Sequence, residues 1–349
     1  MLKTLGSRND YLALMKFAVA TGFLYALTRS ILFLSTSTPG TTFNYQLTKD
    51  TIPVSTNAPS QPASNFQHDS IRTIVIDSTA IAIGKRGLKE EDFINQILTD
   101  TAFYEAFHSL KHFSFIADNN IRTFNKKGEQ TAHITRSLLH DNSTANYHIR
   151  VLSQRDSGEV YKSGGRYRLF TVQMFSYVFE NEKNSDFIKD QSPEQKLQEG
   201  YKQKLKKLIF RPGTRIDGLP FISDKTEIFS KKLRPYYNYK FSSATYLNAV
   251  PVYRFECKVK PQFANDGSVM IKELTTIFDK KNFKILGRFV DMQYENLLFS
   301  FDVRMNIEAR YIDDEIVPVL IQYAGNWDVP FKKKEISSFI VSLHDFKKK

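Results

Sequence analysis

The second half of the chain alternates between apolar and polar residues. The longest stretch runs from Phe299 to Tyr311, with apolar side chains at the odd-numbered positions and mostly charged or polar ones at the even-numbered positions. Shorter stretches of the same kind lie at 237–241, 253–260 and 317–323. A period of two is typical of antiparallel strands with one apolar face and one wet face. We therefore expect a meander of long antiparallel strands, with hairpin loops at 279–282 and 313–314.

The region before this meander shows helical spacing. Phe93, Ile94 and Ile97 predict a short helix over 89–98, and a second apolar stripe predicts a helix over 101–111. Further elements are expected as a strand over 71–83, a strand around 147–151 and a basic helix over 195–209. Together these patterns predict an α+β fold. Its main part is one large curved antiparallel sheet, an incomplete barrel, covered by helices within a single domain over 71–349.

The chain is rich in aromatic residues, and many of them are expected on the apolar face of this sheet. The chain has 29 Phe and 17 Tyr against 15 Gly, which favours sheets over glycine-rich phosphate loops. The side chains expected to line an apolar ligand cavity are Tyr239, Phe241, Tyr253, Phe255, Phe299, Phe301, Met305 and Tyr323. A sheet curved around such a face encloses a volume that side chains, helices or a ligand must fill.

The N-terminal residues have the pattern of an export signal. Lys16 precedes an apolar run over 17–27, and small residues follow at 35–37. We expect 1–37 to be a signal peptide that directs the protein to the periplasm of a Gram-negative cell envelope. A retained inner-membrane signal anchor is the alternative, although Arg29 interrupts the apolar run. Residues 38–70 are rich in Pro, Ser and Thr and are expected to form a disordered linker.

The net charge of +12 is concentrated in one window. Residues 201–240 hold eleven Lys and Arg but three acids. The expected contacts for an anionic head group or partner are Lys202, Lys206, Arg211, Arg215, Lys231 and Arg234. Such a window can be a solvated face, or it can meet an anionic membrane surface or an acidic partner. No nucleic-acid-binding motif accompanies it, so no nucleic acid is expected as a partner.

Few residues suggest chemistry. Glu105, His108 and His112 have the spacing of metal ligands on a helix, but a solvated helix end explains them as well. Cys257 is the one cysteine and lies on an apolar strand face, where it is expected to pack as a small hydrophobe. The sequence contains no G-x-S-x-G, H-E-x-x-H or P-loop motif. We therefore predict no catalytic residue, metal or cofactor.

Five segments support a resemblance to known proteins. They are 91–94, 100–107, 209–213, 236–239 and 252–255, and they are similar to uncharacterised exported proteins of Bacteroidetes-type bacteria. The C-terminal meander, with Tyr323-Ala324-Gly325-Asn326-Trp327, resembles the LolA/LolB-like outer-membrane lipoprotein-sorting fold. That resemblance implies an incomplete antiparallel barrel, plugged by helices, that holds acyl chains.

Three functions remain open from the sequence. The leading one is a non-enzymatic envelope protein that binds a lipid, a lipoprotein acyl chain or another apolar ligand in its half-barrel. The second is a structural or interaction protein of the envelope that places its basic window on an acidic partner. The third is an envelope hydrolase without a recognisable motif.

Overall fold

A computed structural model describes part of this chain. The described residues are 76–77, 87–143, 147–162, 167–169, 171–172, 207–217, 223–295, 300–328 and 334–349. All of them belong to one compact unit, His68–Lys349. The signal peptide expected over 1–37 and the linker over 38–70 lie outside the described residues. So do most of the strand expected over 71–83 and the basic helix over 195–209, of which 207–210 is described as helical.

One antiparallel sheet of 11 strands organises this unit. The spatial order is β1-β5-β6-β7-β8-β9-β10-β11-β2-β3-β4. The strands are β1 (Ile76–Asp77), β2 (Phe113–Phe124), β3 (Gln130–Asp141), β4 (His148–Gly158), β5 (Tyr237–Tyr246), β6 (Val250–Val259), β7 (Ile271–Asp279), β8 (Ile285–Glu295), β9 (Ser300–Ile312), β10 (Glu315–Asp328) and β11 (Glu335–Lys348). The sheet does not close, because β4 ends it on one side and β1 on the other.

Two meanders make up the sheet. Strands β5 to β11 follow one another along the chain, and so do β2 to β4. They meet where the last strand, β11, pairs with β2 from Ile336↔Phe124 to Lys348↔Phe113. The predicted meander is confirmed, and its expected loop at 313–314 is a two-residue hairpin turn. Asp313 and Asp314 there have φ of 46° and 65°, as a tight turn that matches strand twist requires.

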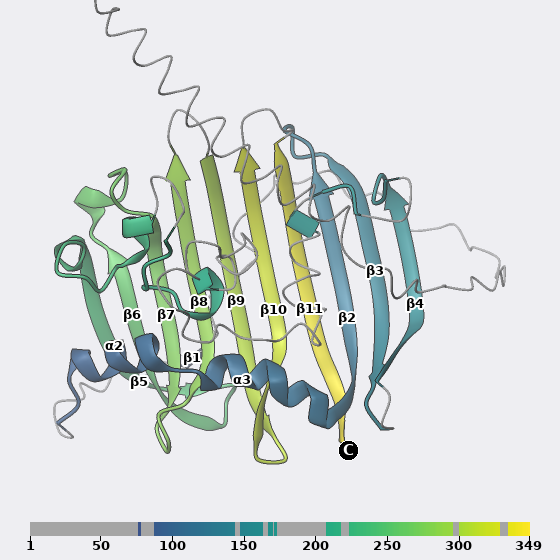
Figure 1. The fold of residues 1–349 in the computed structure, drawn as a ribbon, viewed down its shortest axis with the longest axis horizontal. Helices are drawn as coiled ribbons and strands as arrows, with labels where there is room; N and C mark the ends of the chain where they lie inside the picture. The colour runs from purple at the N-terminus through teal and green to yellow at the C-terminus, as the bar shows by residue number, and fades with distance from the viewer. Residues whose placement is uncertain are drawn as a thin grey trace, which may run out of the picture. The chain divides into compact units, whose positions relative to one another are not determined.

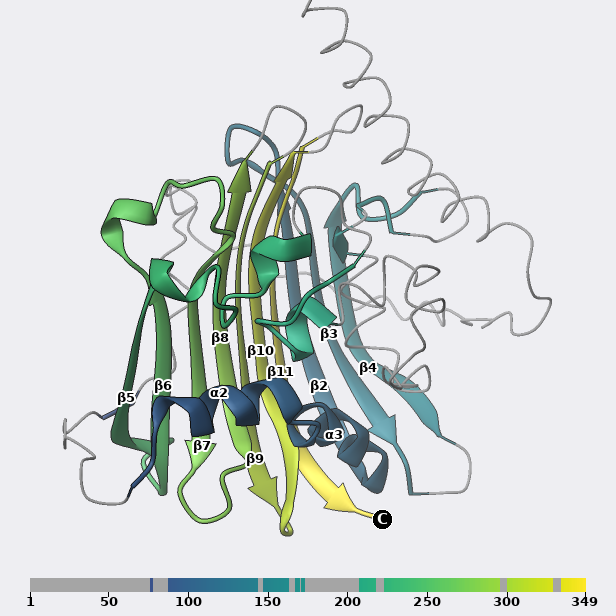
Figure 2. The same cartoon turned by 60° about the vertical axis from the view of Figure 1, so that its left-hand side comes forward.

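Two short helices cover one face of the sheet. Helix α2 (Glu90–Thr99) and helix α3 (Ala102–Ser109), which continues as a 3-10 turn η2 (Leu110–His112), match the two predicted helices. Figures 1 and 2 show them crossing the strands on the concave side of the sheet. The segments η5 (Ser223–Thr226) and η6 (Arg234–Tyr236) lie over the same side. We call this covered side the inner face. Within the described residues, no helix is long and apolar enough to cross a bilayer.

The predicted facing of β9 is correct. Phe301, Val303, Met305, Ile307 and Ala309 are all buried, in agreement with the odd-numbered apolar pattern. Among the even-numbered residues of this strand, Asn306 is the one that is also fully buried. The α+β prediction, a large curved antiparallel sheet with covering helices, is therefore confirmed.

Candidate functional site

The predicted aromatic residues that the structure describes share the inner face. Strand pairing sets Tyr239 opposite Cys257 and Phe241 opposite Phe255 on β5 and β6, while Tyr253 lies two residues before Phe255. Across the sheet, Tyr323 of β10 lies opposite Met305 of β9. Phe301 follows the same alternation on β9. Phe299 lies outside the described residues.

Phe93 of helix α2 packs against the first group of aromatic residues. The Phe93 ring stacks on Phe255, with centroids 5.4 Å apart and planes 6° apart, and on Phe241 at 4.9 Å. It meets Tyr253 edge-on at 5.9 Å and lies 5.4 Å from Phe278. The face predicted to line a cavity is thus packed by the protein's own helix at this end.

A second aromatic group lies on β9 to β11. Phe301 stacks on Trp327 at 4.9 Å, and Tyr323 stacks on Phe339 at the same distance. Trp327 Nε1 donates a hydrogen bond of 2.8 Å to the Tyr323 hydroxyl, which ties the two stacks together. The group around Phe93 lies over β5 to β7, and β8 lies between β7 and the second group.

Between the two groups lies an arginine with almost no exposure. Arg288 of β8 is 1% exposed, and its Nη1 donates a 2.7 Å hydrogen bond to the carbonyl of Phe210. Its guanidinium carbon lies 4.7 Å from the centre of the Phe103 ring of α3. Among the residues that the structure describes, the Nε and Nη2 atoms have no hydrogen-bond partner. Two nitrogens of a buried cation, with three N–H groups, are therefore unsatisfied in an apolar environment, which is costly unless something binds them.

A second unsatisfied side chain lies directly beside this arginine. Thr276 of β7 is opposite Arg288 in the strand pairing, so both side chains lie on the inner face. Thr276 is 0% exposed, and within the described residues its Oγ1 also lacks a hydrogen-bond partner. A hydroxyl and three N–H groups without partners thus lie on two paired residues of the inner face.

The charge of Arg288 persists despite its burial. Desolvation lowers the pKa of its guanidinium to about 10, and the Asp100 carboxylate partly offsets this effect. The site therefore keeps a positive charge at neutral pH. Asp100 itself accepts the backbone N–H of Phe103 at 2.9 Å and the Gln96 side-chain amide at 3.3 Å, which holds the start of α3.

The sequence contains a signal for Arg288 that the alternation analysis did not use. Inner-face positions of β8 after it are Val290, Met292 and Tyr294, all apolar and buried. Arg288 is the charged exception in this run. A single charge within the apolar face of a buried strand marks a position where stability is sacrificed.

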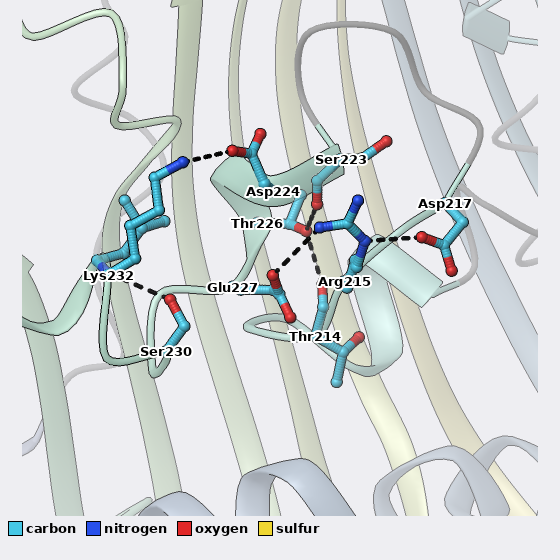
Figure 3. Close-up of polar contacts among 10 residues, drawn as sticks. Thr214, Arg215, Asp217, Ser223, Asp224, Thr226, Glu227, Ser230 and Lys232 are labelled. Atoms are coloured by element: carbon cyan, nitrogen blue, oxygen red, sulfur yellow. Dashed lines mark hydrogen bonds and ion pairs between the residues drawn. The ribbon is translucent and has the colours of Figure 1, made fainter.

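Three cations of the basic window, Arg215, Lys232 and Arg234, pair with acids of the same chain. Arg215 Nε lies 2.8 Å from Asp217, and its Nη1 lies 3.6 Å from Glu227. Figure 3 shows these contacts together with the 2.7 Å pair of Lys232 and Asp224.

Other members of this window differ in their surroundings. Arg234 of η6 lies 2.5 Å from Glu90 and 2.8 Å from Glu91 of α2. Arg211 is partly buried and Lys231 is exposed. Lys202 and Lys206 lie outside the described residues. These pairs reduce the charge that Arg215 and Arg234 present to an outside partner.

His108 and His112, predicted as possible metal ligands, contact neighbouring side chains instead. His112 Nδ1 lies 2.6 Å from Glu315 of β10, and the ring of His108 packs edge-on against Tyr104 at 4.8 Å. Within the described part of the chain, no group of three or more His, Cys, Asp or Glu is arranged to hold a metal. Cys257 is fully buried, and burial raises the pKa of its thiol, so it packs as a neutral side chain.

Comparisons with known proteins give one structural neighbour. No family model and no curated protein matches the chain. Among solved structures, the chain is similar to a DUF1329 family protein from Desulfovibrio piger ATCC 29098, at 9% identity. The match covers 72% of this chain and 94% of that chain, with a TM-score of 0.21. Similarity at this TM-score carries no argument about function, so the LolA/LolB-like and Bacteroidetes-type resemblances stay predictions.

Proposed function

We propose that the protein binds an acyl ligand with an acidic head group between the inner face of the sheet and helices α2 and α3. The observation that carries the proposal is the pair of unsatisfied nitrogens on Arg288, Nε and Nη2. A carboxylate is the group that a guanidinium fork binds best, because two parallel N–H···O bonds form at once. The Thr276 hydroxyl can donate a further hydrogen bond to the same head group.

The surroundings of Arg288 suit the apolar part of such a ligand. Phe103 of α3 and Phe210 lie on one side of the guanidinium, and Ile307 lies opposite it on β9. Each buried methylene contributes about 0.8 kcal/mol, so about ten of them contribute about 8 kcal/mol before ordering costs.

Binding therefore requires the covering helices to move. Phe93 and Phe103 occupy the space on the inner face that an acyl chain would use. Helix α2 is short, and the ion pairs that Arg234 makes with it are partly exposed, so they hold it weakly. We infer that α2 and α3 act as a displaceable cover.

The polar atoms at this site favour binding over catalysis. Thr276 Oγ1 has no hydrogen-bond partner, so no general base activates it as a nucleophile. A guanidinium can orient and neutralise an anion but cannot accept a proton at neutral pH. Location in the cell envelope remains part of the proposal on the strength of the N-terminal pattern over 1–37.

Copurification tests this function. The full-length protein and the Arg288→Met variant would be purified in parallel from a Gram-negative membrane extract and analysed by native mass spectrometry. We expect an acidic lipid or fatty acid with the parent protein and little or none with the variant. The proposal fails if the parent protein carries no lipid and oleate does not raise its melting temperature.

A further inference from the structure

Strand β4 is an exposed edge of the sheet within the described residues. It is the last strand in the spatial order, and every one of its 11 residues is exposed. Among the residues that the structure describes, β3 is its one strand partner. Ile149, Val151 and Leu152 are 47%, 41% and 46% exposed. Proteins shield a long edge with lysine, proline, other charged side chains or a β-bulge; β4 contains no lysine or proline, but it has charged side chains and a bulge.

A β-bulge determines which side chains of β4 lie on each face of the sheet. The pairing with β3 shifts at Leu152, where Ser137↔Ser153 is followed by Leu138↔Val151. As a result, Arg150 and Arg155 share the outer face, opposite Leu139 and Thr135. Two cations thus mark one side of the edge.

The other side of β4 carries different residues. Ile149 and Val151 point to the inner side, opposite His140 and Leu138. Beyond the bulge, Asp156 shares this side, opposite Ile134. The edge strand therefore has two exposed apolar side chains on its inner side, Ile149 and Val151, and two cations on its outer face, Arg150 and Arg155.

This arrangement works against pairing with a second copy. Antiparallel self-pairing must keep side chains of one face together. In one register that meets this condition, Arg150 of each copy lies opposite Arg155 of the other copy. Shifting that register by two residues one way sets Arg155 against His148, and shifting it the other way sets Val151 against Asp156. In none of these three registers does an acid lie opposite Arg150 or Arg155.

We propose that the outer edge of β4 takes an extended segment of another protein with acidic residues alternating with apolar ones. The segment would continue the sheet as an additional strand, with main-chain hydrogen bonds supplying affinity and side chains supplying specificity. Its acids lie opposite Arg150 and Arg155, and its apolar side chains cover Ile149 and Val151. Because β4 has one extra residue at the bulge, a regular partner strand meets the two arginines with acids four residues apart.

A labelled peptide tests this edge. The probe is a fluorescein-labelled peptide of about ten residues that alternates Glu and Val, matched to the length of β4. Fluorescence anisotropy would measure its affinity for the full-length protein, for Arg155→Glu and for Lys240→Glu. Lys240 is an exposed cation on β5, which is far from β4 in the strand order. Lys240→Glu therefore changes the net charge by the same amount as Arg155→Glu without touching β4. We expect Arg155→Glu to weaken binding about tenfold and Lys240→Glu less than twofold.

Hydrogen exchange locates the bound strand. Amides of 148–158 should gain protection when the peptide binds. Equal losses in both variants, or binding without protection of β4, would overturn the proposal. So would a dimer, seen by sedimentation, that itself protects β4, because a second copy would then be the occupant. Amides of β4 that are already protected in the free chain would show that another segment of the same chain occupies the edge. That result would also overturn the proposal.

Discussion

Thr276 and Arg288 face each other on neighbouring strands beneath the covering helices, and each holds polar atoms without a partner. Both side chains are almost fully buried. Buried polar groups are normally hydrogen-bonded, so two exceptions on paired residues call for an explanation. The proposed acidic head group would satisfy both at once.

Removing the buried charge should stabilise the protein. Arg288→Met replaces an incompletely paired cation with an apolar side chain, and such replacements raise the free energy of unfolding by about 1 kcal/mol or more. Loss of the hydrogen bond to Phe210 reduces this gain. Urea unfolding followed by Trp327 fluorescence measures it. Arg310→Met, at an exposed position of β9, is the control and should change stability by less than about 0.5 kcal/mol. A large loss of stability in Arg288→Met would assign Arg288 a structural role.

Phe93 should hold the cover on the inner face. Phe93→Ala removes a ring that contacts Phe255 and Phe241 and should lower the free energy of unfolding by about 3–5 kcal/mol. Asn95→Ala, on the exposed side of α2, should change it by less than about 0.5 kcal/mol. If α2 is a displaceable cover, Phe93→Ala should also bind oleate more tightly. Weaker oleate binding by a folded Phe93→Ala protein would contradict that role.

The facing of β9 has a direct test. Phe301 is 5% exposed and stacks on Trp327, so Phe301→Asp should unfold the domain, with a loss of more than about 4 kcal/mol. Arg310→Asp introduces the same side chain at an exposed position and should cost less than about 1 kcal/mol. Circular dichroism during thermal melting compares the two. Similar losses in both variants would refute the assignment of the faces.

His140 should make stability depend on pH. It is 4% exposed and stacks on Phe115 at 4.5 Å, and burial lowers its pKa to about 4. The unfolded chain, with a His pKa near 6.5, binds this proton more readily than the folded one. The contribution is therefore complete above about pH 6.5 and is lost as pH falls towards 4, by about 3 kcal/mol at 1.36 kcal/mol per unit.

A variant isolates this contribution from the carboxylates that titrate in the same range. His140→Gln should show a shallower fall in unfolding free energy between pH 6.5 and 4 when both proteins are unfolded in urea. Identical slopes for the two proteins would show that His140 is not the group responsible.

The sequence predicted the elements that have a clear period. The odd-numbered apolar residues of β9 and the stripe of Phe93, Ile94 and Ile97 in α2 each gave the correct element and face. Strands β2 and β3 were not predicted. Their polar residues, such as Asn119 and His140, lie on the buried side, so the alternation is broken there.

The candidate site was predicted less completely. Alternation correctly placed Tyr253, Phe255 and the other described aromatic residues on one face. It could not show that Phe93 fills the space between them, because the meeting of a helix with a distant strand depends on tertiary packing. Arg288 was missed because the alternation analysis did not treat the one charged residue on the apolar face of β8 as a signal.

The most direct test of the account compares two ligands that differ in the head group alone. Oleate and oleyl alcohol would be titrated into the parent protein and into Arg288→Met by isothermal calorimetry. The account predicts that the parent protein prefers oleate by about tenfold or more, as a charge-assisted pair of hydrogen bonds provides, and that Arg288→Met binds both equally. An equal preference for oleate in both proteins, or no binding of either ligand, would contradict it.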